Sequence, residues 1–212
     1  MPETDKIFSI LDETFPNAQC ELDFGSVFEL LVAVILSAQC TDRRVNVVTK
    51  DLFRIASTPE EFAAMDPADL EKEIYSCGFY RNKAKNIIAA SKAIVAGGGK
   101  VPDTFDGLLA LPGVGRKTAN VVFDVGFGGD GIPVDTHVFR TSNRLGIAPG
   151  KTPREVEENL LRIIPEGKRN RVHHLLIFLG RYRCKAISPG CDDCPLNRYC
   201  KYFHDKRGNR NE

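Results

Sequence analysis

Lys117 and Asp135 are the two side chains whose types and positions most suggest covalent chemistry. Lys117 stands two residues after the last glycine of Leu-Pro-Gly-Val-Gly (111–115). Asp135 opens the segment Asp-Thr-His-Val (135–138), at the start of a helical pattern where Asp is also a favoured N-cap. A lysine amine forms Schiff bases with electrophilic carbons, and a fixed carboxylate stabilises positive charge that develops near it. A solvated helical lysine is the more common explanation for one such residue, so the chemistry depends on the aspartate lying close to it.

Four cysteines near the C-terminus form a second chemical group, spaced C-x6-C-x2-C-x5-C. They are Cys184, Cys191, Cys194 and Cys200. Thiolates this close together bind metal, either as a structural zinc site or as an iron–sulfur cluster. Zinc sites usually pair two closely spaced turns such as C-x2-C, whereas this segment holds one. The spacing modestly favours a cluster and leaves zinc as the alternative.

Length and cysteine usage bound the class of protein. The chain has 212 residues, of which 42% are hydrophobic, so it can bury a core in one or two domains. Its acidic N-terminus lacks an apolar leader, and the longest apolar stretch, 30–36, is too short to span a bilayer. We expect a cytoplasmic protein whose isolated cysteines, Cys20, Cys40 and Cys77, are small core residues.

Charge is distributed unevenly although the formal net charge is only +1. Residues 1–27 carry six acids and one base, whereas residues 166–212 carry eleven Lys or Arg and five Asp or Glu. A basic C-terminal region can bind a polyanion even when the total charge is near zero, and it can equally be a solvated tail.

The elements that must position these groups are predicted to be helices. Thr58-Pro59 and Thr152-Pro153 are typical helix starts, and the stretch 27–38 is apolar on all sides, as in a buried helix. A stripe of buried-type residues from Ala84 to Val95 ends at three glycines. Sustained alternation typical of strands is lacking, so the sequence predicts an all-α fold.

The segment around Pro112 is predicted to join two helices. Residues 105–111 and 116–127 have helical patterns, and Gly113 and Gly115 permit positive φ in the turn between them. Amides at the start of the second helix can bind an anion such as a phosphodiester. An ordinary corner between helices is the competing interpretation.

Taken together, these segments resemble the endonuclease III family of helix-hairpin-helix DNA glycosylases. The family motif joins an LPGVG hairpin, a lysine two positions later and an aspartate in VDTHV, followed by the four-cysteine spacing. LSAQCTD (36–42) and CGFYRNKAKNI (77–87) resemble two further family segments. The likeness extends from about residue 25 to residue 200. Phe79 departs from the family, where an aliphatic side chain is frequent, and so does Cys40.

The resemblance implies a two-lobed all-α glycosylase fold with a C-terminal [4Fe–4S] cluster loop. Residues 22–132 would form a helical domain that contains the hairpin (about 105–127). Residues 1–21 and 133–212 would form the cluster domain, with the cysteine loop at 184–200. The Gly-rich stretch 126–133 suits the boundary between them.

The resemblance also implies a bifunctional DNA glycosylase and AP lyase of base excision repair, acting on oxidised pyrimidines. Lys117 would attack the sugar and form a Schiff base, and Asp135 would assist as the second catalytic residue. The four cysteines would ligate one structural [4Fe–4S] cluster. The partner would be duplex DNA with damaged bases or abasic sites, bound by a monomer in the cytoplasm and at the nucleoid.

Contacts to DNA are expected from the hairpin, from two inserting side chains and from the second domain. These residues are Gln39, Phe79, Leu111, Gly113, Val114, Gly115, Arg116, Thr118, His137, Arg140 and Lys185. Gln39 would fill the space of the extruded base, and Phe79 would act as a wedge in the opposite strand.

Two other functions remain as alternatives. A related glycosylase could remove mismatched thymine or adenine, although such relatives generally carry another residue at the position of Lys117. A non-catalytic module could bind DNA through the hairpin alone. Base release and strand nicking on damaged duplexes distinguish these possibilities.

Overall fold

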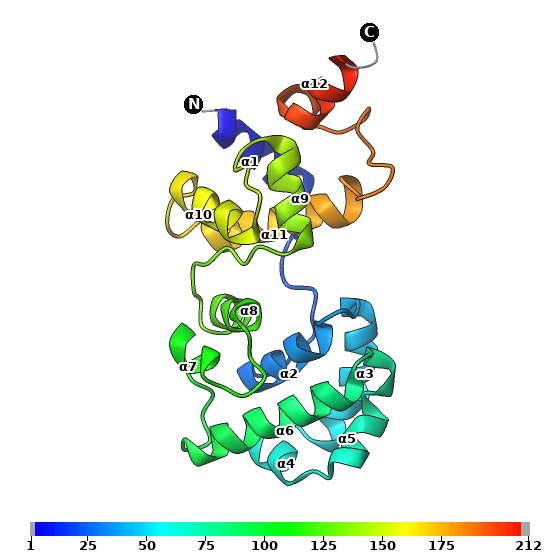
Figure 1. The fold of residues 1–212 in the computed structure, drawn as a ribbon, viewed down its shortest axis with the longest axis vertical. Helices are drawn as coiled ribbons and strands as arrows, with labels where there is room; N and C mark the ends of the chain where they lie inside the picture. The colour runs from blue at the N-terminus through cyan, green and yellow to red at the C-terminus, as the bar shows by residue number, and fades with distance from the viewer. Residues whose placement is uncertain (1–2, 209–212) are drawn as a thin grey trace. The chain divides into compact units, whose positions relative to one another are not determined.

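The chain folds entirely into helices and connecting loops over residues 3–208, the part that this computed structural model describes (Figure 1). The predicted all-α class is therefore confirmed. The backbone divides into two compact units. One unit is Glu21–Gly129, and the other combines the chain up to Cys20 with the residues from Asp130 onward.

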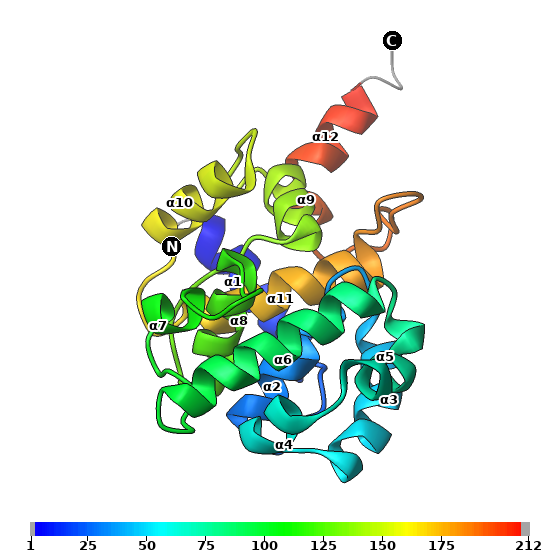
Figure 2. The ribbon, with the colours of Figure 1, turned by 60° about the horizontal axis from the view of Figure 1, so that its bottom comes forward.

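The unit Glu21–Gly129 is built around a buried central helix, α2. Its elements are α2 (Val27–Ser37), α3 (Asp42–Ile55), α4 (Pro59–Ala64), α5 (Pro67–Glu73), the 3-10 turn η1 (Tyr75–Cys77), α6 (Tyr80–Ala96), α7 (Phe105–Leu109) and α8 (Arg116–Gly126). All side chains from Leu30 to Leu36 are buried, as the apolar pattern predicts. Helices α3, α6 and α8 pack against α2, and α4 and α5 pack against α6 (Figure 2).

Polar caps fix where these helices begin. The Thr58 hydroxyl accepts a hydrogen bond from the Glu61 amide, and the Glu61 carboxylate accepts one from the Thr58 amide, which completes the predicted capping box. Asp66 caps α5 by accepting from the Ala68 amide at 2.7 Å. Each such cap contributes about 1 kcal/mol to helix stability.

Two packing predictions, one for α6 and one for the isolated cysteines, are partly wrong. Val95 was expected on the buried stripe of α6, but it is 38% exposed because it follows Ile94 by one residue and so turns away from the core. Among the three isolated cysteines only Cys77 is a core residue; Cys20 and Cys40 are partly exposed because each stands in a loop rather than inside a helix.

The second unit packs around α11. Its elements are α1 (Glu3–Thr14), α9 (Thr136–Leu145), α10 (Pro153–Ile163), α11 (Arg169–Phe178), the π-helical turn η2 (Leu179–Arg183), the 3-10 turn η3 (Asn197–Tyr199) and α12 (Lys201–Gly208). Arg171 of α11 fastens the N-terminal segment, since its guanidinium bonds to the Asp12 carboxylate and to the Phe15 and Pro16 carbonyls. Helix α1 thereby joins one apolar core with α9, α10 and α11.

Candidate functional site

A tight turn joins α7 to α8, as the hairpin motif predicts. Gly113 has φ +75°, a conformation that favours glycine, and a Cβ added there would overlap the Asn86 side chain. Leu111 and Val114 are buried, and the Val114 amide donates to the Leu111 carbonyl at 3.1 Å. These two side chains anchor the turn in the core. If Leu111 and Val114 contact DNA, as the sequence predicts, they must do so through backbone atoms.

The start of α8 presents amides and cations to solvent. Gly115 precedes the helix with φ −88°, so it does not use the positive φ that glycine permits, and a Cβ added there would meet open space. Lys117 and Arg116 are exposed in the first turn of α8. The Arg116 guanidinium lies over the Phe105 ring, 5.4 Å from its centroid. The cation–π contact holds Arg116 beside the hairpin.

Gln39 and Phe79 face one cavity of this unit in strained conformations. Both are exposed, with Phe79 at 69%, and their φ angles are +53° and +48°. Such angles are uncommon outside glycine and concentrate at functional sites. The same cavity is lined by Gly113 and Thr118. Phe79 is therefore not part of the hydrophobic core. Four of the residues predicted to contact DNA, Gln39, Phe79, Gly113 and Thr118, line this one cavity.

Asp135 caps the N-terminus of α9, as its position in the sequence predicts. Its Oδ1 atom accepts hydrogen bonds from the His137 and Val138 amides, both 2.8 Å long. The two amide hydrogen bonds fix the direction of the Asp135 carboxylate. Burial lowers the pKa of the adjacent His137 imidazole, against the opposing charge of Asp135. His137 is therefore mainly neutral at pH 7.

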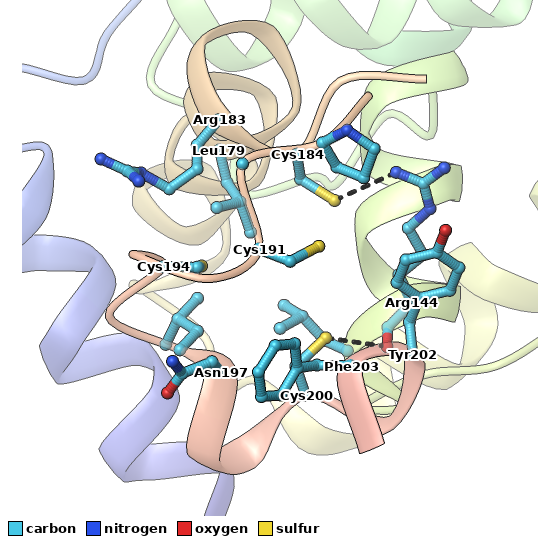
Figure 3. A pocket seen from close by; sticks show the side chains of 14 residues that line it. Arg144, Leu179, Arg183, Cys184, Cys191, Cys194, Asn197, Cys200, Tyr202 and Phe203 are labelled. Atoms are coloured by element: carbon cyan, nitrogen blue, oxygen red, sulfur yellow. Dashed lines mark hydrogen bonds between the residues drawn. The ribbon is translucent and has the colours of Figure 1, made fainter. Parts of the chain in front are cut away.

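The four clustered cysteines surround one cavity in the second unit (Figure 3). All four lie on the segment between η2 and α12. Three of them, Cys184, Cys194 and Cys200, also pack against the apolar core of the unit. Burial raises the pKa of the Cys194 and Cys200 thiols. Thiolates at these positions therefore require a nearby positive charge.

Two arginines on one face of α9 hold the cysteine loop. Arg140 donates from Nε to the Cys184 carbonyl at 3.0 Å and from Nη2 to the Gly180 carbonyl at 2.9 Å. Arg144 donates to the Cys184 sulfur at 3.4 Å and to the Lys185 carbonyl at 2.7 Å. The Arg140 guanidinium is thus engaged inside its unit, whereas the Lys185 side chain extends into solvent.

Comparison with known proteins identifies the family. A model described as HhH-GPD superfamily base excision DNA repair protein matches residues 32–166. Endonuclease III of Bacillus subtilis (strain 168) is 52% identical over 202 residues, which cover 93% of this chain and 92% of the relative. Endonuclease III of Escherichia coli (strain K12) is 44% identical over 198 residues, covering 93% and 94%.

The chain belongs to the endonuclease III family. A solved structure of a trapped endonuclease III–DNA covalent intermediate matches with a TM-score of 0.91 and 45% identity, over 98% of this chain and 99% of that one. A thermostable thymine-DNA glycosylase, 21% identical with a TM-score of 0.82 over 96% of this chain and 97% of that one, shares the fold. The family resemblance and the expected fold class are confirmed.

Membership of the endonuclease III family makes the chain a bifunctional DNA glycosylase and AP lyase of base excision repair. The structure brings Gln39, Phe79, Gly113 and Thr118 to one cavity, and the four cysteines to another. Lys117 and Asp135 belong to different units, and each is fixed at a helix start within its own unit. In residues 3–208, no helix has both the length and the apolar character needed to cross a membrane.

Sequence reasoning missed the residues that hold these loops. Arg140 and Arg144 are four apart on α9, and this spacing could have indicated one shared helix face. Lys83 is only 5% exposed and donates from Nζ to the Leu36 carbonyl at 2.8 Å and to the Cys77 carbonyl. It precedes Ile87 by four residues, so it falls on the buried stripe of α6 that the sequence does reveal.

Proposed function

We propose that this endonuclease III family member removes oxidised pyrimidines from duplex DNA and cuts the strand 3′ to the resulting abasic site. The observation that carries this assignment is the position of Lys117. Its side chain is exposed in the first turn of α8, two residues after the hairpin glycine. A nucleophile at this position is held at a fixed place relative to the hairpin, which we propose binds the DNA backbone.

Lys117 supplies the nucleophile in this proposal. Its neutral amine attacks C1′ of the damaged nucleotide, and the bond from C1′ to the base breaks with its electrons leaving on the base. The amine then forms a Schiff base with the opened sugar. Loss of a proton from C2′ expels the 3′ phosphate by β-elimination and nicks the strand.

Asp135 supplies a fixed negative charge. Both amide hydrogen bonds are accepted by Oδ1, which orients the carboxylate and leaves Oδ2 to face the sugar in our proposal. A preorganised carboxylate stabilises the positive charge that develops on the sugar as the base departs. It also assists deprotonation of the attacking amine.

The hairpin and the basic second unit position the DNA. We assign the phosphate contact to the amides of Gly113 and Gly115 and to the first turn of α8, with support from Arg116 and Thr118. Lys185 contributes a cation from the cysteine loop, and the neutral imidazole of His137 contributes a polar contact from the first turn of α9. Arg140 acts indirectly, because its donors hold the loop that carries Lys185.

Gln39 and Phe79 stabilise the extruded base. We assign Gln39 to the vacated space and Phe79 to the opposite strand. The support is their exposure, their positive φ angles and their shared cavity. An aromatic ring can stack on the orphaned base, and extrusion costs least at damaged pairs, which favours lesions over intact bases.

The four cysteines fit one structural [4Fe–4S] cluster. The four thiols line a shared cavity. Their C-x6-C-x2-C-x5-C spacing, with a single C-x2-C turn, favours a cluster over zinc. Cys184, Cys191, Cys194 and Cys200 would ligate the iron, and its positive charge would offset the cost of buried thiolates.

The test is a panel of duplexes that each carry one change, with base release and strand nicking scored separately. The panel contains an oxidised pyrimidine, a thymine opposite guanine, an adenine opposite an oxidised guanine, and an abasic site. We expect release and nicking together at the oxidised pyrimidine and nicking at the abasic site. Release confined to a mismatched thymine or adenine would favour the alternative glycosylase; binding without either product would favour a non-catalytic module.

The proposed setting is a monomer acting on cytoplasmic, nucleoid-associated DNA. The support is the role of the HhH-GPD superfamily in base excision DNA repair and a solved endonuclease III–DNA complex, 45% identical with a TM-score of 0.91.

A further inference from the structure

Cys40 and Cys77 lie in neighbouring segments although the three helices α3, α4 and α5 separate them in sequence. Cys40 follows α2 in a loop and is partly exposed, whereas Cys77 closes η1 and is 1% exposed. Lys83 contacts both the carbonyl of Cys77 and that of Leu36, at the end of the helix that Cys40 follows, and Cys40 is among the groups that act on the Cys77 thiol. Two neighbouring cysteines, one of them partly open to solvent, form a pair that a two-electron oxidant can join.

The buried Lys83 ammonium holds the two cysteine segments in place. It donates to the Leu36 carbonyl at the end of α2 and to the carbonyl of Cys77 itself. Burial lowers the pKa of Lys83, while Cys40 and Cys77 raise it. Lys83 thus ties the end of α2, which leads into the loop of Cys40, to the segment that carries Cys77.

Each cysteine is a near neighbour of a strained residue that faces the cavity. Gln39 directly precedes Cys40, and Phe79 follows Cys77 after Gly78, which has φ +60°. A bond between the cysteines would thus connect the two loops that carry the proposed inserting side chains.

We propose that Cys40 and Cys77 form a reversible disulfide in response to peroxide, and that this bond restrains Gln39 and Phe79 and slows lesion processing. The effect on processing rests on the insertion roles given above, whereas formation of the disulfide does not. Transient disulfides of this kind are the type found in reducing compartments.

The reaction balances with hydrogen peroxide as the oxidant. The Cys40 sulfur attacks a peroxide oxygen, the O–O bond breaks, and one water leaves, so Cys40 becomes a sulfenic acid. The Cys77 sulfur then attacks the Cys40 sulfur and displaces the hydroxyl, which leaves as a second water with the Cys77 proton. Two thiols lose two electrons in total, and one peroxide gains them.

Burial and charge decide the order of the two steps. Burial, followed by the neighbouring Cys40, raises the pKa of the Cys77 thiol to about 11, against the smaller opposing effects of Lys83 and Arg44. Cys77 is therefore a poor initial target for peroxide at neutral pH. The more exposed Cys40 reacts first, and Cys77 resolves the sulfenic acid.

The first arm of the test is peptide mapping after treatment of the whole protein with hydrogen peroxide. Wild type is compared with Cys40→Ser, Cys77→Ala and Cys20→Ser, the last as the matched control for an isolated, partly exposed cysteine. We expect a peptide pair linked through Cys40 and Cys77 in wild type and Cys20→Ser, lost on reduction and absent from the other two variants. Conversion of Cys40 to its sulfinic acid without that linkage would overturn the proposal.

The second arm measures activity on the same samples, with iron content recorded to confirm that the cysteine loop is unchanged. We expect the linked protein to lose about tenfold or more in base release, recovered on reduction, with binding to undamaged duplex retained. Cys40→Ser should keep its activity after peroxide. Full activity of the linked protein would remove the regulatory role, and a reduced protein without base release would instead contradict the proposed function.

Discussion

The guanidinium of Arg144 donates a hydrogen bond to the sulfur of Cys184, 3.4 Å away and 40 positions later in the chain. The same side chain donates to the carbonyls of Lys185 and Ala186, at 2.7 and 3.1 Å. Its guanidinium also lies over the Tyr202 ring, 4.7 Å from the centroid. One residue of α9 thus contacts the first cysteine of the loop, the backbone that follows it and the start of α12.

Arg144→Gln should weaken retention of the cluster, because it removes a donor to one sulfur and two anchors of the loop. Iron per folded chain, followed during exposure to a chelator, should fall faster than in wild type. Arg154→Gln is the matched control, since Arg154 is 87% exposed and pairs only across one helical turn. Equal rates of iron loss in all three proteins would contradict a holding role for Arg144.

The cysteine loop should contain a [4Fe–4S] cluster and lose it when a ligand is removed. Elemental analysis of wild type should find about four irons per chain, with a brown colour. Cys194→Ser should lose iron and much of its solubility, because the loop and its contacts with the core depend on the bound group. A colourless wild type with stoichiometric zinc would contradict the cluster.

The two hairpin glycines should respond differently to substitution by alanine. Gly113→Ala forces a left-handed residue and overlaps Asn86, so it should lower the free energy of unfolding by about 1–3 kcal/mol. Gly115→Ala, at φ −88° in open space, should leave stability nearly unchanged while weakening DNA binding by obstructing the phosphate. Thermal unfolding and binding to undamaged duplex separate the two effects; equal loss of stability would refute this difference.

Lys185 should contribute to DNA binding in a way that does not depend on the lesion. Lys185→Gln should weaken binding to damaged and undamaged duplexes alike and reduce the slope of log affinity against log salt by about 0.9. Lys151→Gln, a substitution of another exposed lysine in the same unit, is the control. Weakened binding to damaged duplex alone would show that Lys185 takes part in lesion recognition.

Local patterns were sufficient to predict the elements that carry the site. The capping box at Thr58, the buried helix after Ser26 and the cap at Asp135 all depend on neighbours within four residues, so the sequence displays them directly. The hairpin turn could also be predicted from the sequence. Its backbone has φ +75° at Gly113, and glycine is the residue that adopts such an angle most readily.

Contacts between residues far apart in the chain could not be predicted from the sequence. Arg144 and Lys83 act through partners 40 and 47 positions away, and a single sequence contains no signal for such distances. The exposure of Phe79 was expected only through the family resemblance, which implies a wedge in the opposite strand, because an aromatic residue taken alone is usually buried. Its left-handed backbone turns the ring away from the core instead.

The most direct test of the account is borohydride trapping by Lys117→Gln on duplex with an oxidised pyrimidine. The reagent reduces a Schiff base and joins enzyme to DNA covalently. We predict trapping, base release and nicking by wild type and by Lys92→Gln, an exposed lysine on α6. We predict none of the three by folded, iron-loaded Lys117→Gln, which should still bind the duplex through its hairpin. Trapping by Lys117→Gln at the wild-type rate would contradict the account and move the nucleophile to another amine.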